Sequence, residues 1–508
     1  MADLRSQKQL PPSDSTKSMN NQQNHSKSRK IVAFAALIAI LMVIWSINRQ
    51  TKNSQLAQNE SENIESKSLI ERWRNKNSDR QNPEVDRRFS LGEKILIGAD
   101  NNPNKQMAVE KFAAGEFREA QIAFANSLDV NPNDPEALIY LNNSLAAFDY
   151  KPIKIGASVP IGGSLDVAKE ILRGIAQAQN EINKKGGIER DGVKRMLQVQ
   201  IANDDNQPEV AEQIADRFVA NPEIMAVIGH NSSTASIAAA PIYQQGNLVM
   251  ISPTSVAREL SQAGDYIFRT TPSSRILAES IAQYAVDDIR REKIAVCADS
   301  GSPASISFKD EFTLAVFELG GENANTTCDF SSADFDPDRV PSQAIADGAE
   351  ALLLIPSVDK INQALEISKA NQKRLTILGN HSMYTYETLK IGQSDLSGMV
   401  IPTSWHPNST VDSSFNQNAK KLWGKEGSWR TATAYDATKA LAAGLSLANT
   451  RQQLQQTLAN PGFATPGVLG DITFLRSGDR QVKGTLVKIQ PGTSSGTGFD
   501  FKPLDTNK

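Results

Sequence analysis

The sequence predicts an α/β protein with two lobes of parallel sheet flanked by helices, preceded by a transmembrane helix and a short helical hairpin. Three observations support this prediction. Short apolar runs alternate with amphipathic helical stripes from Lys154 onward, which is typical of βαβ units. An uncharged apolar stretch occupies residues 31–47, and apolar residues recur at helical spacing through residues 101–149.

Composition excludes several classes of function. The 508 residues are enough for several domains, and a net charge of −3 leaves no basic excess for a nucleic-acid partner. Two cysteines and four scattered histidines cannot supply a zinc ribbon or an iron–sulfur cluster. We therefore expect no metal, no cofactor and no nucleic acid.

The N-terminal region predicts the compartment. Residues 1–30 are basic and polar, and we expect a disordered cytoplasmic tail. Residues 31–47 would span about 25 Å of a hydrocarbon core about 30 Å thick. Because neither a small-residue cleavage site nor a lipoprotein cysteine follows, we predict an uncleaved single-pass anchor, with a cleaved signal peptide or a buried core helix as alternatives. The excess of basic residues before the anchor places the N-terminus in the cytoplasm and the rest outside the plasma membrane.

Residues 48–100 are rich in Asn, Gln, Ser and Glu, and we expect a linker. Residues 101–149 contain F-x-x-G-E-F-x-x-A-x-x-x-F-x-x-x-L followed by N-P-N-D-P-E-A, which resembles a tetratricopeptide unit. Since about one and a half repeats are too few for a stable solenoid, we expect the unit to pack on a neighbouring domain or on a protein partner. The alternative is a separate peptide-binding groove.

From Lys154 onward the sequence predicts strands that alternate with helices. One expected helix has apolar residues from Ala168 to Ile182 and stops at Lys184-Lys185-Gly186-Gly187, where cations and glycine suit a C-terminus. So long an alternation exceeds a single core, so two lobes are expected. The expected strands are Ile153–Val159, Met196–Ala202, Met225–Ile228, Leu248–Ile251, Lys293–Cys297, Ala351–Ile355, Thr376–Leu378 and Met399–Ile401.

Hydroxyl clusters follow three of these strands, at residues 231–234, 252–255 and 299–305. A single cluster of this kind is usually a helix N-cap. Three clusters at successive strand ends instead favour a ligand site, because the amides at helix starts bind anions at the carboxyl edge of an open sheet.

Seven stretches resemble the type I periplasmic binding proteins, the Leu/Ile/Val-binding family of ABC importers: K-I-G-A-S-V-P at 154–160, G-I-A-Q-A-Q-N-E-I-N-K-K-G-G-I at 174–188, V-I-G-H-N-S-S-T at 227–234, I-S-P-T-S at 251–255, I-F-R-T-T-P at 267–272, Y-D-A at 435–437 and G-D-I-T-F-L-R-S-G-D-R at 470–480. The order of tail, anchor, helical unit and binding domain is similar to that of cyanobacterial members.

This resemblance implies a binding domain over residues 152–508, with two lobes joined by three crossovers that close on a ligand held between them. It implies a lobe 1 of about residues 152–271 and 402–466, and a lobe 2 of about 272–401 and 467–505. No chemistry is implied, and an ABC permease is the implied partner.

The resemblance also implies ligand residues. The candidates at or beside the family's motifs are Ser232, Ser233, Thr234, Thr254, Ser255, Ser305 and His381, and we expect Ser357, Tyr384 and Trp405 to line the same cleft from lobe 2 and the crossover. Four positions depart from the family: Val167 replaces an aromatic residue, Val256 a threonine, Ala304 a tyrosine, and His381 the acid that pairs with a ligand ammonium. We therefore expect a small anionic or neutral polar solute without a free α-amine, or a site that no longer binds.

Three classes of function compete. The leading one is a membrane-tethered extracytoplasmic solute-binding protein of an ABC importer, which binds an amino acid, amide or carboxylate. The second is a ligand sensor or adaptor that reports lobe closure to another membrane protein, with a protein partner at the helical unit. An enzyme is not expected, since there is no H-E-x-x-H and no Walker motif and the histidines are not spaced for a metal.

Two alternatives remain for Cys297 and Cys328. If residues 325–330 form a strand beside residues 293–297, the Cα atoms come within disulfide range, and the expected compartment is oxidising. The reading that we favour is two buried free thiols.

The anchor prediction can be tested by mass spectrometry of the membrane fraction. Peptides from residues 1–47 should be present, because nothing in the sequence directs cleavage after the apolar run. A soluble mature chain that begins after residue 50 would contradict the prediction.

Overall fold

The computed structural model describes residues 83–149, 151–409 and 414–504. The predicted tail, the anchor and the first part of the linker lie outside these residues. Within the described ranges, no helix has both the length and the apolar character needed to cross a bilayer.

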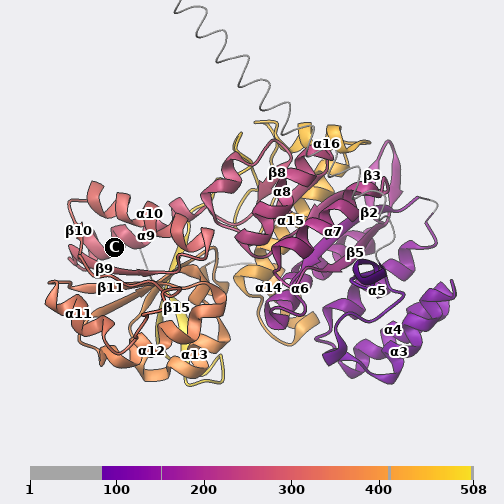
Figure 1. Cartoon of the computed structure of the whole chain (residues 1–508). Coiled ribbons are helices and arrows are strands. Elements are labelled where there is room, and N and C mark those ends of the chain that lie inside the picture. The colour runs from indigo at the N-terminus through magenta and orange to yellow at the C-terminus, as the bar shows by residue number, and fades with distance from the viewer. Residues whose placement is uncertain (1–82, 150, 410–413, 505–508) are drawn as a thin grey trace, which may run out of the picture. The chain divides into compact units, whose positions relative to one another are not determined.

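Lobe 1 is built on a sheet that includes β2 (Ile153–Val159), β5 (Leu197–Asn203) and β8 (Ile267–Arg269), which are labelled in Figure 1. Its first strand, β1 (Phe89–Ser90), is antiparallel to its neighbour β5, and the other strands are parallel. In spatial order the strands are β1 (Phe89–Ser90), β5 (Leu197–Asn203), β2 (Ile153–Val159), β6 (Ile224–Ile228), β7 (Val249–Ser252) and β8 (Ile267–Arg269).

Helices cover both faces of this sheet. Side chains alternate along a strand, so that Ala226 and Ile228 belong to one apolar cluster and Val227 belongs to the other. The first cluster includes α6 (Leu165–Lys184), α14 (Ser414–Trp423), α15 (Trp429–Leu445) and α16 (Arg451–Leu458). The second includes α7 (Pro208–Ala220) and α8 (Ser233–Gln245). A hairpin, β3 (Ile188–Arg190) and β4 (Val193–Arg195), and a short turn, η3 (Arg258–Gln262), complete the lobe.

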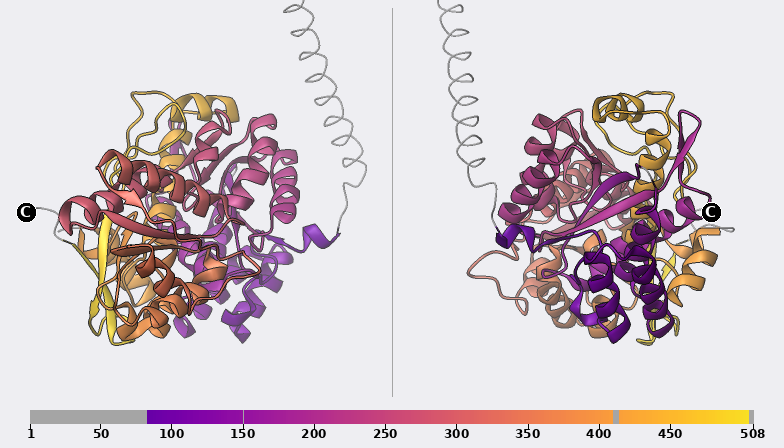
Figure 2. Two further views of the ribbon diagram at one scale, coloured as in Figure 1. Left: turned by 60° about the vertical axis from the view of Figure 1, so that its left-hand side comes forward. Right: turned by 90° about the vertical axis from the view of Figure 1, so that its right-hand side faces the viewer.

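Lobe 2 has a second sheet whose neighbouring strands are parallel except at β14 (Thr485–Pro491), which is antiparallel to both β13 (Val400–Thr403) and β15 (Phe499–Pro503). β14 and β15 lie at one end of this sheet (Figure 2, left, yellow). In spatial order the strands are β10 (Glu322–Asn323), β9 (Lys293–Ala298), β11 (Ala351–Ile355), β12 (Thr376–Gly379), β13 (Val400–Thr403), β14 (Thr485–Pro491) and β15 (Phe499–Pro503).

One apolar cluster of lobe 2 includes α9 (Ser274–Gln283), the π-turn η4 (Tyr284–Asp288) and α10 (Pro303–Glu318). The other includes α11 (Val340–Ala346), α12 (Ile361–Asn371) and α13 (Tyr386–Gly392), on the opposite side of the sheet (Figure 1). Short turns are η5 (Val358–Lys360), η6 (His381–Met383), η7 (Gln393–Leu396) and η8 (Pro407–Ser409).

In the described residues the chain passes between the lobes after β8, after β13 and before β14. A hydrogen bond of 2.8 Å between the hydroxyls of Thr271 and Ser404 joins the first two crossovers. Gly484, on the third, lies close to the Thr403 carbonyl oxygen, which an added Cβ would meet at 3.5 Å. The crossovers therefore run side by side.

The predicted start of the last lobe 2 segment, at residue 467, was wrong. Ile472 and Phe474 are buried in the core of lobe 1, and the Phe474 ring lies 5.1 Å from that of Phe268. Residues 467–480 therefore belong to lobe 1.

The predicted linker was also wrong for residues 83–100. α2 (Pro83–Asp86) is followed by β1, which pairs with β5 and places Phe89 opposite Ala202. Val85, Phe89 and Ile97 are buried. Three apolar residues with irregular spacing make no periodic pattern, and the pairing of β1 with β5 and the Arg88–Asp205 ion pair also hold this segment on lobe 1. A turn, η2 (Gly98–Asp100), leads to the helical unit.

The helical unit consists of α3 (Pro103–Ala113), α4 (Phe117–Val130) and α5 (Pro135–Ala146), shown in indigo in Figure 2 (right). α5 packs against α6 and β5. The buried Asn143 side chain accepts a hydrogen bond from the Val199 amide at 2.9 Å and donates to the Val199 and Leu91 carbonyls. Of the two packings expected for this unit, on a neighbouring domain or on a protein partner, the structure shows the first.

A buried charge holds α3 to α5. The Lys105 ammonium, which is fully buried, lies 2.7 Å from carboxylates of both Asp134 and Glu136. Burial alone would lower the pKa of Lys105, but the two carboxylates raise it above its ordinary value. Glu136 also accepts hydrogen bonds from the Leu96 and Ile97 amides, so this cluster joins the helices to the segment before them.

Cys297, in β9, and Cys328 form a disulfide, so the favoured reading of two free thiols was wrong. The expected strand over residues 325–330 contributes one bridge, between Ala298 and Asp329, and the regular strand beside β9 is β10. The pairing predicted for a disulfide nevertheless places the two Cα atoms 4.7 Å apart.

Lys105→Met should lower the free energy of unfolding by about 3–5 kcal/mol, because it leaves two buried carboxylates without a cation. Urea denaturation followed by circular dichroism measures the change. Lys111→Met is the matched control on the same helix: its ion pair with Glu116 is exposed, and stability should be nearly unchanged. Equal effects of the two substitutions would contradict the prediction.

Thiol titration of the denatured protein tests the disulfide. Without reductant no free thiol should be detected, and after reduction the two thiols of Cys297 and Cys328 should appear. Two thiols before reduction would restore the free-thiol reading.

Candidate functional site

A cavity of about 380 Å³ lies between the lobes and has a polar lining, a size suited to a small molecule. Its walls come from strand ends and helix starts of both sheets, the location predicted from the hydroxyl clusters. Among the candidates, Ser232, Ser233, Thr234, Thr254, Ser357 and His381 line it.

The lobe 1 wall is the start of α8. Ser232 caps this helix, and its hydroxyl accepts a hydrogen bond from the Ala235 amide at 3.1 Å. The Ser233 hydroxyl accepts from the Ala257 amide at 3.2 Å and keeps its own proton to donate. The amides of the first turn have no partner within the helix, so this wall offers donors to an anionic or carbonyl oxygen.

Two neighbouring positions support this wall differently. Thr254 lines the cavity, and its hydroxyl donates to the Asn231 carbonyl at 2.8 Å. Ser255 is not among the lining residues. Its buried hydroxyl forms a hydrogen bond of 2.8 Å with that of Ser236 and so holds the loop after β7 against α8. Val256 is also buried, in an apolar cluster with residues of α9 and α10, and does not line the cavity.

The lobe 2 wall is formed by the segment after β9 together with Ser331 and residues 357–360. Ser305 does not line the cavity. Its buried hydroxyl accepts from the Asp299 amide and donates to the Ile355 carbonyl, so it joins the ends of β9 and β11. Asp299, which sequence reasoning did not select, does line the cavity.

His381 lies at the start of η6 and lines the cavity. Burial, with the nearby Arg430 guanidinium, lowers the pKa of its imidazole to about 3, so the ring is neutral at neutral pH. Its Nδ1 atom is buried without a hydrogen-bond partner in the described part of the chain. The neutral ring can therefore donate or accept a hydrogen bond with a solute, but it cannot supply the negative charge that pairs with an ammonium.

Trp429 and Arg430, at the start of α15, line the cavity and were missed by sequence reasoning. The Arg430 guanidinium lies 4.5 Å from the centre of the Trp429 ring. One of its nitrogens, Nη1, donates to Glu170 at 3.1 Å and to the Tyr384 carbonyl of lobe 2 at 3.4 Å. The one available sequence signal was that these residues begin the helical segment that carries the Y-D-A motif at 435–437.

Tyr384 and Trp405 are not among the lining residues. The Tyr384 ring stacks on Phe501 with centres 4.2 Å apart. Trp405 is buried in a cluster with Phe415 and Trp429. Trp405 therefore acts one layer behind the cavity, by supporting the tryptophan that lines it.

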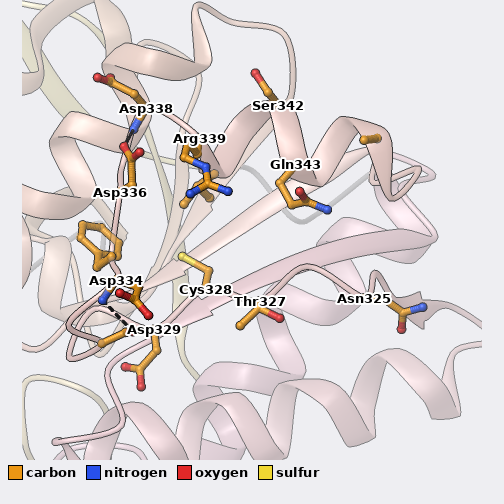
Figure 3. Close-up of a pocket in the computed structure, with 14 residues that line it drawn as sticks. Asn325, Thr327, Cys328, Asp329, Asp334, Asp336, Asp338, Arg339, Ser342 and Gln343 are labelled. Carbon is orange, nitrogen blue, oxygen red and sulfur yellow. Dashed lines mark hydrogen bonds between the residues drawn. The ribbon is translucent and has the colours of Figure 1, made fainter.

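A second hollow, of about 920 Å³, lies on lobe 2 near Cys328 (Figure 3). The carboxylates of Asp329, Asp334, Asp336 and Asp338 are spread along its loop. In the part of the chain that the structure describes, no group of three His, Cys, Asp or Glu side chains is arranged to hold a metal ion.

Residues 492–496 read G-T-S-S-G and fit the G-x-S-x-G pattern of hydrolase nucleophiles. They form the turn between β14 and β15, where Asp500 accepts hydrogen bonds from the Ser494 and Ser495 amides. The hydrolase motif needs a strand followed by a helix, so here the pattern marks a hairpin turn.

Comparison with known proteins agrees with this architecture. Residues 152–491 match the family model described as periplasmic binding protein. The Leu/Ile/Val-binding protein BraC3 of Rhizobium johnstonii is 23% identical over 350 residues, 68% of this chain and 93% of that protein. The Leu/Ile/Val-binding protein of Escherichia coli K12 is 33% identical over 165 residues, 32% of this chain and 42% of that protein.

Among solved structures, an ABC transporter substrate-binding protein from Desulfitobacterium hafniense in complex with Leu shares the fold, with a TM-score of 0.59 and 24% identity. The match covers 69% of this chain and all of that one. From the two-lobed fold, the cavity between the lobes and a family match over residues 152–491, we conclude that this chain belongs to the periplasmic binding protein family.

Proposed function

We propose that this chain is the solute-binding component of an ABC importer and that it closes its two lobes on a small polar solute. The solute is an amino acid, an amide or a carboxylate. The observation that carries this proposal is the polar cavity, which takes its lining from both lobes and has the first turn of α8 as one wall. The Leu/Ile/Val-binding names of the relatives support an amino acid within this class.

Contacts between the lobes beside the cavity support closure. Arg430 of lobe 1 donates to the Tyr384 carbonyl of lobe 2. On a second side, Arg258 in η3 pairs with Asp310 in α10 at 3.1 Å, and its amide donates to the Ser307 hydroxyl. Because these contacts bridge the two lobes, separation of the lobes would break them and closure would form them again.

The membrane side of the proposal comes from the sequence. Residues 31–47 would tether the protein to the plasma membrane as a single-pass anchor, with the N-terminus in the cytoplasm and the binding lobes outside. Tethering would keep the lobes near their partner, an ABC permease in the same membrane, and so raise its effective concentration.

A second candidate function is a ligand sensor or adaptor. It is favoured by the attachment of the helical unit to lobe 1 through Asn143, while the Lys105 cluster holds the helices of the unit together. A protein partner on this unit would move with lobe 1 whenever a solute closes the cavity.

Binding can be tested by thermal shift and calorimetry on the whole chain, with the twenty L-amino acids, their amides and simple carboxylates as probes. A solute at 100 times its dissociation constant should add about 2.7 kcal/mol to stability. Ser233→Ala should weaken binding about tenfold, because it removes a hydroxyl donor from the α8 wall.

Thr450→Ala is the matched control. Its hydroxyl also accepts a hydrogen bond from a backbone amide, that of Gln453, but caps α16 outside the cavity lining. This variant should bind as the parent does. A chain that binds none of the probes would overturn the proposal.

A further inference from the structure

Asp299 is a buried carboxylate on the cavity wall whose pairing is incomplete. It directly follows the last residue of β9, Ala298, and is 3% exposed. One oxygen, Oδ1, accepts hydrogen bonds from the Ser331 hydroxyl at 2.6 Å and from the Gly301 amide at 3.1 Å. The other oxygen, Oδ2, has no hydrogen-bond or ion-pair partner among the described residues.

The segment that carries Ser331 holds this carboxylate in place. The Cys297–Cys328 disulfide ties the segment to β9. The Phe330 amide donates to the Ala298 carbonyl at 3.0 Å, next to Asp299 in the chain. With Oδ1 bound to this fixed segment, Asp299 is oriented before a solute arrives, which lowers the entropic cost of binding.

The side chains that line the cavity carry charges of both signs. Arg430, 4% exposed, lies beside His381, so that wall disfavours an ammonium. Lys360 and the exposed Asp359 also line the cavity, next to each other in η5. Asp299 is therefore the buried negative charge of the lining, and a buried charge is costly until an opposite charge reaches it.

We propose that Asp299 binds the ammonium group of a zwitterionic amino acid whose carboxylate lies at the first turn of α8. The inference rests on the proposed function and names its solute class. Sequence reasoning expected a solute without a free α-amine because it considered position 381, where the acid is missing. The fold supplies an acid from another strand of the same cavity.

Calorimetry on the whole chain with L-leucine and 4-methylpentanoate tests the inference, since the second probe is leucine without its ammonium. The parent protein should bind leucine at least about 30-fold more tightly than 4-methylpentanoate. Asp299→Asn keeps an oxygen for Ser331 and Gly301 but loses the charge, and it should weaken leucine binding by a similar factor with little effect on 4-methylpentanoate.

Asp395→Asn is the matched control, because it removes an exposed carboxylate of lobe 2, in η7, that is not among the cavity-lining residues, and it should leave the leucine affinity within about threefold. Thermal melting without solute checks that both variants fold. Should Asp299→Asn fail to fold, Ser331→Ala, which only releases Oδ1, should weaken leucine binding more than 4-methylpentanoate binding.

The outcomes separate the two proposals. If leucine binds and Asp299→Asn or, in its place, Ser331→Ala leaves its affinity unchanged, the inference is overturned and the proposed function stands. The same holds if 4-methylpentanoate binds as tightly as leucine. If neither these probes nor the wider panel of amino acids, amides and carboxylates binds, the proposed function falls, and the inference falls with it.

Discussion

A buried ion pair between Asp436 and Arg480 fixes the junction of the two lobes. The two side chains are fully buried and 2.6 Å apart. Arg480 also donates to the carbonyls of Thr270 and Gly470, and Asp436 accepts from the Val468 amide. One guanidinium thus ties α15 to the first crossover and to the loop before the third. Neither charge could stay buried without the other, so these segments keep one arrangement.

The binding cavity depends on this junction because α15 begins with Trp429 and Arg430. Asp436 anchors the same helix two turns further on, so the cavity wall and the crossovers share one rigid element. The lobe closure that we propose would require rotation in the short crossovers, where the Thr271–Ser404 hydrogen bond joins two of them. A helix held to lobe 1 that contacts the Tyr384 carbonyl of lobe 2 makes closure depend on a few polar contacts.

The sequence predicted strands well where they are buried on both faces. β2 and β11 have the predicted bounds. β11 is the clearest case, because its continuous apolar run, A-L-L-L-I, is typical of a buried parallel strand. β1 was missed, because two residues make no pattern. In the site, the rule that ligands bind at strand ends placed both Ser232–Thr234 and residues 299–305. The rule could not single out the Asp299 carboxylate, whose pairing depends on Ser331, nor Arg430, which is held by Glu170. Local patterns contain no information about such contacts.

The attachment of β1 and α5 to lobe 1 has a consequence for how the chain can be divided. A fragment that starts at residue 152, where the family match begins, would lose the strand that covers β5. It would also lose Asn143, which satisfies the Val199 amide and carbonyl. The uncovered edge of β5 would present unpaired backbone groups to a second molecule and act as a template for aggregation. Residues 83–149 therefore help to keep lobe 1 soluble, because they cover this edge.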